Sequence, residues 1–135
     1  MPLQSASPKT VLIVDDEPDI LESMKSLVES EVNQVRVLTA ASGAEALTLL
    51  KRENVELIIT DYRMPGMDGL EFLGKVRKLR PGVPSMMITA YPDADLAVRA
   101  VREYGVGLFI AKPFDLQYLV QLIGSFVAPA AKIQA

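Results

Sequence analysis

Three aspartates follow closely on runs of apolar, strand-forming residues, and they are the groups best suited to chemistry. Asp15 and Asp16 come directly after Thr10–Val14, and Asp61 follows Val55–Ile59. Carboxylates that meet raise one another's pKa unless a cation lies between them. Magnesium suits such a group, because it takes oxygen ligands and commonly uses one or two carboxylates together with phosphate oxygens. A carboxylate beside that metal can attack phosphorus and form an aspartyl phosphate.

A hydroxyl and a cation stand at the ends of two further apolar runs. Thr89 ends Ser85–Thr89, and Lys112 follows Leu108–Ala111. Both side chains can bind phosphoryl oxygens. Phosphoryl transfer asks little covalent chemistry of a protein, because positioning and charge neutralisation do most of the work. Three carboxylates, one hydroxyl and one lysine therefore predict a magnesium-dependent phosphoryl site.

Five strand-like segments alternate with five amphipathic segments that have the spacing of helices. The predicted strands are Thr10–Val14, Val35–Ala40, Val55–Ile59 (ended by Thr60), Ser85–Thr89 and Leu108–Ala111. The predicted helices run from Pro18 to about Glu31, from a Ser42–Glu45 capping box to about Arg52, from Asp68 or Gly69 to Pro81, from Pro92–Asp93 to Gly105, and onward from Asp115. The apolar positions expected in the fourth helix are Leu96, Val98, Val101 and Tyr104.

This alternation predicts one doubly wound α/β domain of the flavodoxin-like type. We expect a (βα)5 unit whose five-stranded parallel sheet has the order 2-1-3-4-5. The switch point between its first and third strands would collect Asp15, Asp16 and Asp61. We expect residues 1–9 to form an N-terminal tail, residues 10–127 the domain, and residues 128–135 a C-terminal tail or linker stub.

Composition excludes several classes of function. The 135 residues suit a single core, and a net charge of −3 argues against direct nucleic-acid binding. The chain has no cysteine and no histidine, which excludes thiolate chemistry, catalytic triads and histidine-ligated zinc. No apolar run approaches the ~20 residues of a membrane span, and the start does not resemble a signal peptide. We therefore expect a cytoplasmic protein with no membrane partner.

Four motifs stand at the ends of four predicted strands. They are Val14-Asp15-Asp16-Glu17, Asp61-Tyr62-Arg63-Met64-Pro65-Gly66-Met67-Asp68-Gly69, Thr89-Ala90 and Lys112-Pro113-Phe114. Together they resemble the receiver domain of two-component response regulators, the CheY-like family, over about Lys9–Val127. Met64, Met67, Met86 and Met87 fit as loop and core filler rather than as a ligand set.

The resemblance implies a role for each site residue. Asp61 is the expected phosphoacceptor and a metal ligand. Asp16 is expected to bind magnesium directly, Asp15 mainly through water, and Arg63 through its backbone carbonyl. In the same way, Thr89 and Lys112 are expected to hold the phosphoryl group. The Lys112–Pro113 bond is expected to be cis.

Three further expectations concern the signalling side. Phe109 matches the family's switch aromatic, which changes rotamer when Thr89 moves, but it lacks the hydroxyl of the more frequent tyrosine. Gly105-Val106-Gly107 is expected to form a loop more mobile than usual before the fifth strand. Arg63 and Tyr91 occupy positions that tune phosphoryl lifetime in the family, and both are expected at the rim of the site.

The resemblance implies a switch rather than an ordinary enzyme. A histidine kinase or phosphotransfer protein would donate the phosphoryl group. The fourth helix, fifth strand and fifth helix would then change surface for an output domain or protein, or for a phosphorylation-dependent homodimer. The kinase, the signal and the output are left open, as is whether the chain is a stand-alone regulator or a fragment.

Two alternatives remain open at this point. A magnesium-dependent aspartyl-phosphate phosphatase would use the same nucleophile, but haloacid-dehalogenase-type enzymes place a second acid where Arg63 stands. A flavodoxin-like cofactor binder would need a phosphate-wrapping loop after the first strand, where Asp15-Asp16-Glu17 would repel a phosphate.

Overall fold

The computed structural model describes residues 8–90 and 93–128 of the chain. The strands are β1 (Lys9–Val14), β2 (Val35–Ala40), β3 (Leu57–Asp61), β4 (Ser85–Thr89) and β5 (Val106–Ala111). The helices are α1 (Pro18–Glu31), α2 (Gly43–Leu50), α3 (Gly69–Leu79), α4 (Ala94–Tyr104) and α5 (Leu116–Val127). The sheet is parallel and has the order β2-β1-β3-β4-β5, which confirms the predicted topology.

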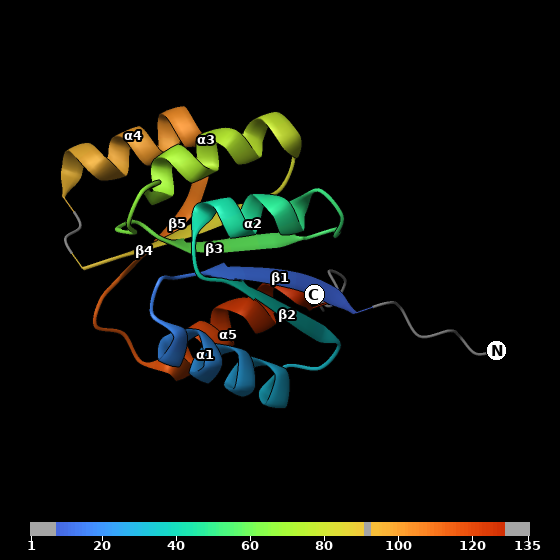
Figure 1. Cartoon of the computed structure of the whole chain (residues 1–135). Coiled ribbons are helices and arrows are strands. Elements are labelled where there is room, and N and C mark those ends of the chain that lie inside the picture. Colours follow the sequence, from blue (N-terminus) through green and yellow to red (C-terminus); the bar gives the residue numbers. More distant parts are fainter. Residues whose placement is uncertain (1–7, 91–92, 129–135) are drawn as a thin grey trace, which may run out of the picture.

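The sheet is covered on both faces (Figure 1). Helices α2, α3 and α4 lie on one face, and α1 and α5 lie on the other. Strand β1 shows why both faces are apolar: Leu12 and Val14 join the core beneath α2–α4, whereas Val11 and Ile13 join the core beneath α1 and α5. Successive side chains of a strand point to opposite faces, so a strand covered on both sides is apolar throughout.

Polar side chains set the starts of four helices. Ser42, Asp68, Asp93 and Asp115 each accept a hydrogen bond from a backbone N–H in the first turn. These caps confirm the predicted helix starts, because such oxygens satisfy N–H groups that have no partner within the helix. Glu45 accepts a hydrogen bond of 2.8 Å from the N–H of Ala41, the residue before the cap, whereas the glutamate of the predicted capping box accepts from the N–H of the cap residue itself.

The predicted bounds of the third strand were wrong. Thr60 does not end β3; it pairs with Val14 and with Met87, and Asp61 pairs with Ile88. Val55 and Glu56 precede the strand instead. Strand length is decided by pairing with both neighbours, which the apolar pattern alone does not report. Asp61 is therefore held by the sheet itself.

Three other predictions on elements were wrong. Val106 and Gly107 lie in β5 rather than in a loop, since β4 pairs as far as Ser85 with Val106. In α4, Val98 and Val101 are 51% and 53% exposed, and the buried positions are Leu96 and Ala100. Helix α2 ends at Leu50 rather than near Arg52. None of the helices in the described residues is long and apolar enough to span a membrane.

Candidate functional site

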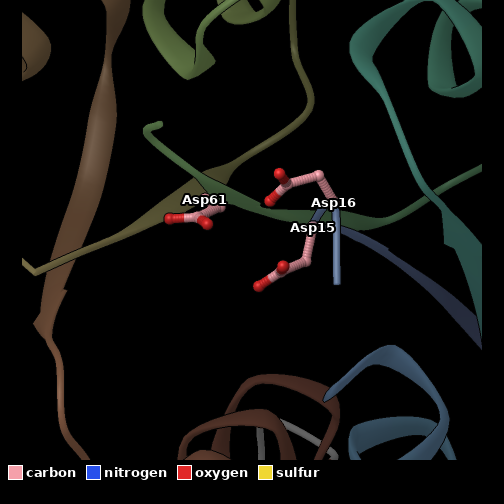
Figure 2. A group of neighbouring side chains, drawn as sticks. All are labelled: Asp15, Asp16 and Asp61. Atoms are coloured by element: carbon pink, nitrogen blue, oxygen red, sulfur yellow. The ribbon is translucent and has the colours of Figure 1, made fainter. Parts of the chain in front are cut away.

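Two adjacent central strands bring three carboxylates together. Asp15 and Asp16 follow the end of β1, and Asp61 is the last residue of β3, whose Thr60 pairs with Val14. One oxygen from each carboxylate lies within 4.8 Å of the others. Figure 2 shows the three side chains grouped at these strand ends. The sheet edge thus builds the acidic cluster that the sequence predicts.

Lys112 reaches this cluster from the end of β5. Its Nζ donates a hydrogen bond of 3.2 Å to Asp61 Oδ2 and lies 3.9 Å from Asp15 Oδ2. Its backbone N–H donates to the carbonyl of Thr89 at 2.9 Å, which ties the ends of β4 and β5 together. The Lys112–Pro113 peptide bond is cis, as expected. The lysine is therefore placed to neutralise a group carried by Asp61.

Burial dominates the electrostatics of the site. Burial raises the pKa of Asp61 and the pKa of Asp15, although Lys112 and backbone N–H groups oppose the rise. For Lys112, burial would lower the pKa, but the hydrogen bond and charge of Asp61, followed by the charge of Asp15, raise it overall. The cluster thus holds more negative charge than one lysine compensates, and a second cation would stabilise it.

One oxygen of Asp15 shows where that cation fits. Asp15 Oδ1 accepts a hydrogen bond from the N–H of Glu17 at 2.9 Å. Asp15 Oδ2 is fully buried and has no hydrogen-bond partner. A buried polar atom without a partner costs about 1–3 kcal/mol, so such an atom calls for a ligand. Carboxylate oxygens are the ligands magnesium prefers, and the donor set therefore fits this metal.

An open pocket of about 480 Å³ adjoins the acidic cluster. It is lined by Asp16, Tyr62, Arg63, Met64, Pro65 and Asp68. Arg63 is exposed at its rim, as the sequence predicts. Tyr91, the second residue expected at the rim, lies outside the described residues. The pocket thus leaves open space directly beside Asp16.

Thr89 and Phe109 lie on the adjacent strands β4 and β5. Thr89 is the buried last residue of β4 and pairs with Ala111 of β5. Phe109 lies two residues earlier on β5, pairs with Met87, and packs partly buried against the core under α2–α4. Both residues occupy the strands that link the acidic cluster to α4 and α5.

Gly69 belongs to the site through its backbone, so the types and spacing of reactive side chains in the sequence do not reveal it. Its N–H donates to the carbonyl of Tyr62 at 2.7 Å, which closes the loop that follows Asp61. A Cβ at this position would lie 2.5 Å from the backbone oxygen of Asp61 and 3.0 Å from Cα of Tyr62. The only signal in the sequence is a glycine directly after the Asp68 cap, because a close backbone approach requires the absence of a side chain.

Residues 11–124 match the family model for the response regulator receiver domain. The chain belongs to this family. Among curated proteins, this receiver domain is 39% identical over 127 residues to the transcriptional regulatory protein GlrR of Escherichia coli strain K12, covering 94% of the chain. It spans only 28% of the length of GlrR. It is also 35% identical to an uncharacterised 14.6 kDa protein of Leptolyngbya boryana, covering 92% of this chain and 94% of that protein.

Solved receiver structures match the same fold. A CheY-like receiver domain protein from Methanospirillum hungatei JF-1 superposes with a TM-score of 0.81 at 35% identity, covering 89% of this chain and 94% of that one. The response regulator TrrA of Thermotoga maritima, solved in complex with magnesium and beryllium fluoride, superposes with a TM-score of 0.71 at 30% identity. That match covers 88% of this receiver domain and 99% of the TrrA chain.

Removing either of the two carboxylates that follow β1 tests the metal site. We expect Asp16→Ala to weaken magnesium binding more than Asp15→Ala, because the resemblance gives Asp16 a direct contact and Asp15 a contact through water. Calorimetric titration of magnesium into each variant measures the two affinities. A smaller loss for Asp16→Ala than for Asp15→Ala would contradict this division of roles.

Proposed function

We propose that this receiver domain is a phosphoaspartate switch in which Asp61 accepts a phosphoryl group from a histidine kinase or phosphotransfer protein. The observation that carries the proposal is the position of Asp61, which is one of three clustered carboxylates and has Lys112 Nζ 3.2 Å from its Oδ2. Membership of the receiver family supports the same assignment. The described elements run from Lys9 to Val127, which supports a domain over residues 10–127.

The transfer step follows from the groups present. A carboxylate oxygen of Asp61 forms a bond to phosphorus, and the bond from phosphorus to the donor breaks, with the leaving group keeping the electron pair. Lys112 then neutralises oxygens of the new phosphoryl group. Asp15 and Asp16, together with Asp61 and the carbonyl of Arg63, would hold magnesium. When bound, magnesium supplies positive charge for the transferring phosphoryl oxygens.

The output of the switch is a change of surface. The Thr89 hydroxyl approaches the phosphoryl group, and its movement opens space for Phe109 on β5. Both states exist before phosphorylation, and the phosphoryl group shifts their populations. Exposed Val98 and Val101 on α4 support a partner-binding role for this side. That partner would be an output domain, an output protein or a second copy.

The class of phosphodonor that the protein uses distinguishes a switch from a phosphatase. With magnesium and a small acyl phosphate, the protein is expected to gain one phosphoryl group and to lose this ability when EDTA removes the metal. A phosphomonoester should be neither a donor nor a substrate. Multiple turnovers of a phosphomonoester would instead favour the phosphatase, and an unlabelled protein under all conditions would refute the switch.

Hydrogen exchange tests the direction of signalling. With magnesium and beryllium fluoride as a phosphoryl mimic, we expect amide exchange to change in α4, β5 and α5, because Thr89 and Phe109 connect the site to these elements. Helix α2 serves as the internal control, since it packs against β2 and α3 away from β5. Changes confined to α2 would contradict the proposed relay.

Residues at the rim are expected to set the lifetime of the phosphoryl group. Hydrolysis requires a water in line with the bond from Asp61 to phosphorus. Arg63 lines the open pocket beside Asp16 and offers no oxygen to orient such a water. We expect Arg63→Asn combined with Tyr91→Ala to shorten the lifetime severalfold. Loss of label from the isolated protein in magnesium measures it, and decay no faster than in the parent would show that these side chains do not guard the site.

A further inference from the structure

Strand β2 forms one edge of the sheet. Among the described residues, its only hydrogen-bonded neighbour is β1. The carbonyl of Ala40 accepts from the N–H of Asp15, so Ala40 turns its backbone groups toward β1. Because successive residues of a parallel strand turn these groups to opposite sides, alternate residues face outward. The outward-facing residues are Val35, Val37 and Thr39.

An open edge of this kind can template pairing with another chain. It presents a row of N–H and C=O groups to any extended strand, and natural proteins blunt such edges. The sequence of β2, VRVLTA, is rich in β-branched residues and has no proline. By composition β2 is therefore well able to pair a second time.

Two side chains of α1 occupy both backbone groups of Val37, the middle outward-facing residue. Glu29 Oε2 accepts a hydrogen bond of 2.8 Å from the N–H of Val37, and Lys25 Nζ donates one of 2.8 Å to its carbonyl. Lys25 and Glu29 also pair with each other at 3.1 Å. The pair therefore imitates the donor and acceptor of a neighbouring strand.

The electrostatics of Glu29 support this geometry. Slight burial would raise the pKa of its carboxyl, but the N–H of Val37 and then the ammonium of Lys25 outweigh that effect and lower the pKa overall. A second ion pair with the same spacing, Arg99–Glu103 on α4, has a distance of 3.9 Å and two side chains that are more than half exposed. Exposed pairs of that kind contribute little to stability. The shorter Lys25–Glu29 pair differs in also binding the strand edge.

The opposite edge of the sheet carries a different device. Between β4 and β5, Ser85 pairs with Val106 and Met86 pairs with Leu108, which leaves Gly107 as an extra residue on β5. Such a bulge twists an edge and disrupts its row of backbone groups. Because the bulge already disrupts the edge formed by β5, β2 is the edge with a regular row of backbone groups, and it is the one that a side-chain cap would protect.

We propose that Lys25 and Glu29 form a cap on the outer edge of β2 that keeps it from pairing with the β2 strand of a second copy of this chain. Two copies related by a twofold axis would place the same strand edge to edge, in antiparallel orientation. The cap competes with this pairing because it already occupies the central N–H and carbonyl.

Exchanging the two residues separates the cap from an ordinary ion pair. Lys25→Glu with Glu29→Lys keeps an i,i+4 pair in an order that favours the helix. However, a lysine cannot accept from the N–H of Val37, and a glutamate cannot donate to its carbonyl. The matched control is Arg99→Glu with Glu103→Arg, which exchanges an i,i+4 pair on α4.

The readouts are self-association of the full chain by sedimentation velocity and exchange of the Val37 amide at low concentration. In the Lys25→Glu, Glu29→Lys variant, we expect the hydrogen of the Val37 amide to exchange with solvent about tenfold faster or more, because a charge-assisted hydrogen bond is lost. We also expect this variant to self-associate as its concentration rises. The control variant should match the parent protein in both Val37 amide exchange and self-association. Lys25→Met with Glu29→Met provides a second uncapped form, with circular dichroism confirming its fold. A folded uncapped variant that matches the parent in both readouts would overturn the proposal.

Discussion

Replacing Gly69 with alanine is expected to destabilise the protein and to disable phosphorylation together. The new Cβ would lie 2.5 Å from the backbone oxygen of Asp61 and 3.0 Å from Cα of Tyr62. Both of these neighbours are backbone atoms, so neither can rotate away as a side chain would. Overpacking of a well-packed interior costs about 1–3 kcal/mol. We expect a loss of unfolding free energy at the upper end of that range, measured by urea denaturation.

The functional loss in this variant has a separate cause. Relief of the clash must shift the backbone at Asp61, which carries the proposed nucleophile, and errors of position in a reacting group lower its rate. Gly124→Ala in α5 is the matched control, because nothing lies within 4 Å of its new Cβ. There the helix should gain about 0.5–1 kcal/mol. A Gly69→Ala protein as stable and as readily phosphorylated as the parent would show that the loop after Asp61 can accommodate a Cβ at this position.

The sequence predicts the arrangement of the sheet well because its signals are strong. TVLIV in β1 is typical of a strand covered on both faces. The caps Ser42, Asp68, Asp93 and Asp115 mark helix starts by a local rule. The carboxylates follow such strands, so the topology alone brings them together. The cis bond before Pro113, by contrast, was expected only from the family resemblance.

Features that depend on how the helices and strands contact one another were not predictable. The end of β3 was misplaced because Thr60 and Asp61 are held by β1 and β4. Val98 and Val101 are apolar but more than half exposed, which their helical spacing does not reveal. The cap on Val37 joins a strand to two charged residues of the preceding helix, and a charged helix face normally indicates only contact with solvent.

Asp61→Asn is expected to separate function from stability. Burial raises the pKa of Asp61 above its ordinary value of 3.8, so its charged form is less favourable in the folded protein than in the unfolded chain. The protonated carboxyl of Asp61 therefore contributes stability at low pH, and this contribution is lost as the pH rises from about 3.8 through the raised pKa. We expect metal-free Asp61→Asn to be more stable than the parent at neutral pH, and the difference to disappear in acid. Urea denaturation in EDTA at both pH values measures this, and a less stable variant at neutral pH would contradict it.

The most direct test of the central claim is the site of phosphorylation itself. Parent protein, Asp61→Asn and Asp68→Asn are incubated with magnesium and a small acyl phosphate, and intact mass spectrometry counts the added phosphoryl groups. Asp68 lies in the same loop and caps α3, a role that asparagine can also fill. We predict one phosphoryl group on the parent and on Asp68→Asn, and none on Asp61→Asn. Full labelling of a folded Asp61→Asn protein would show that Asp61 is not the phosphoacceptor.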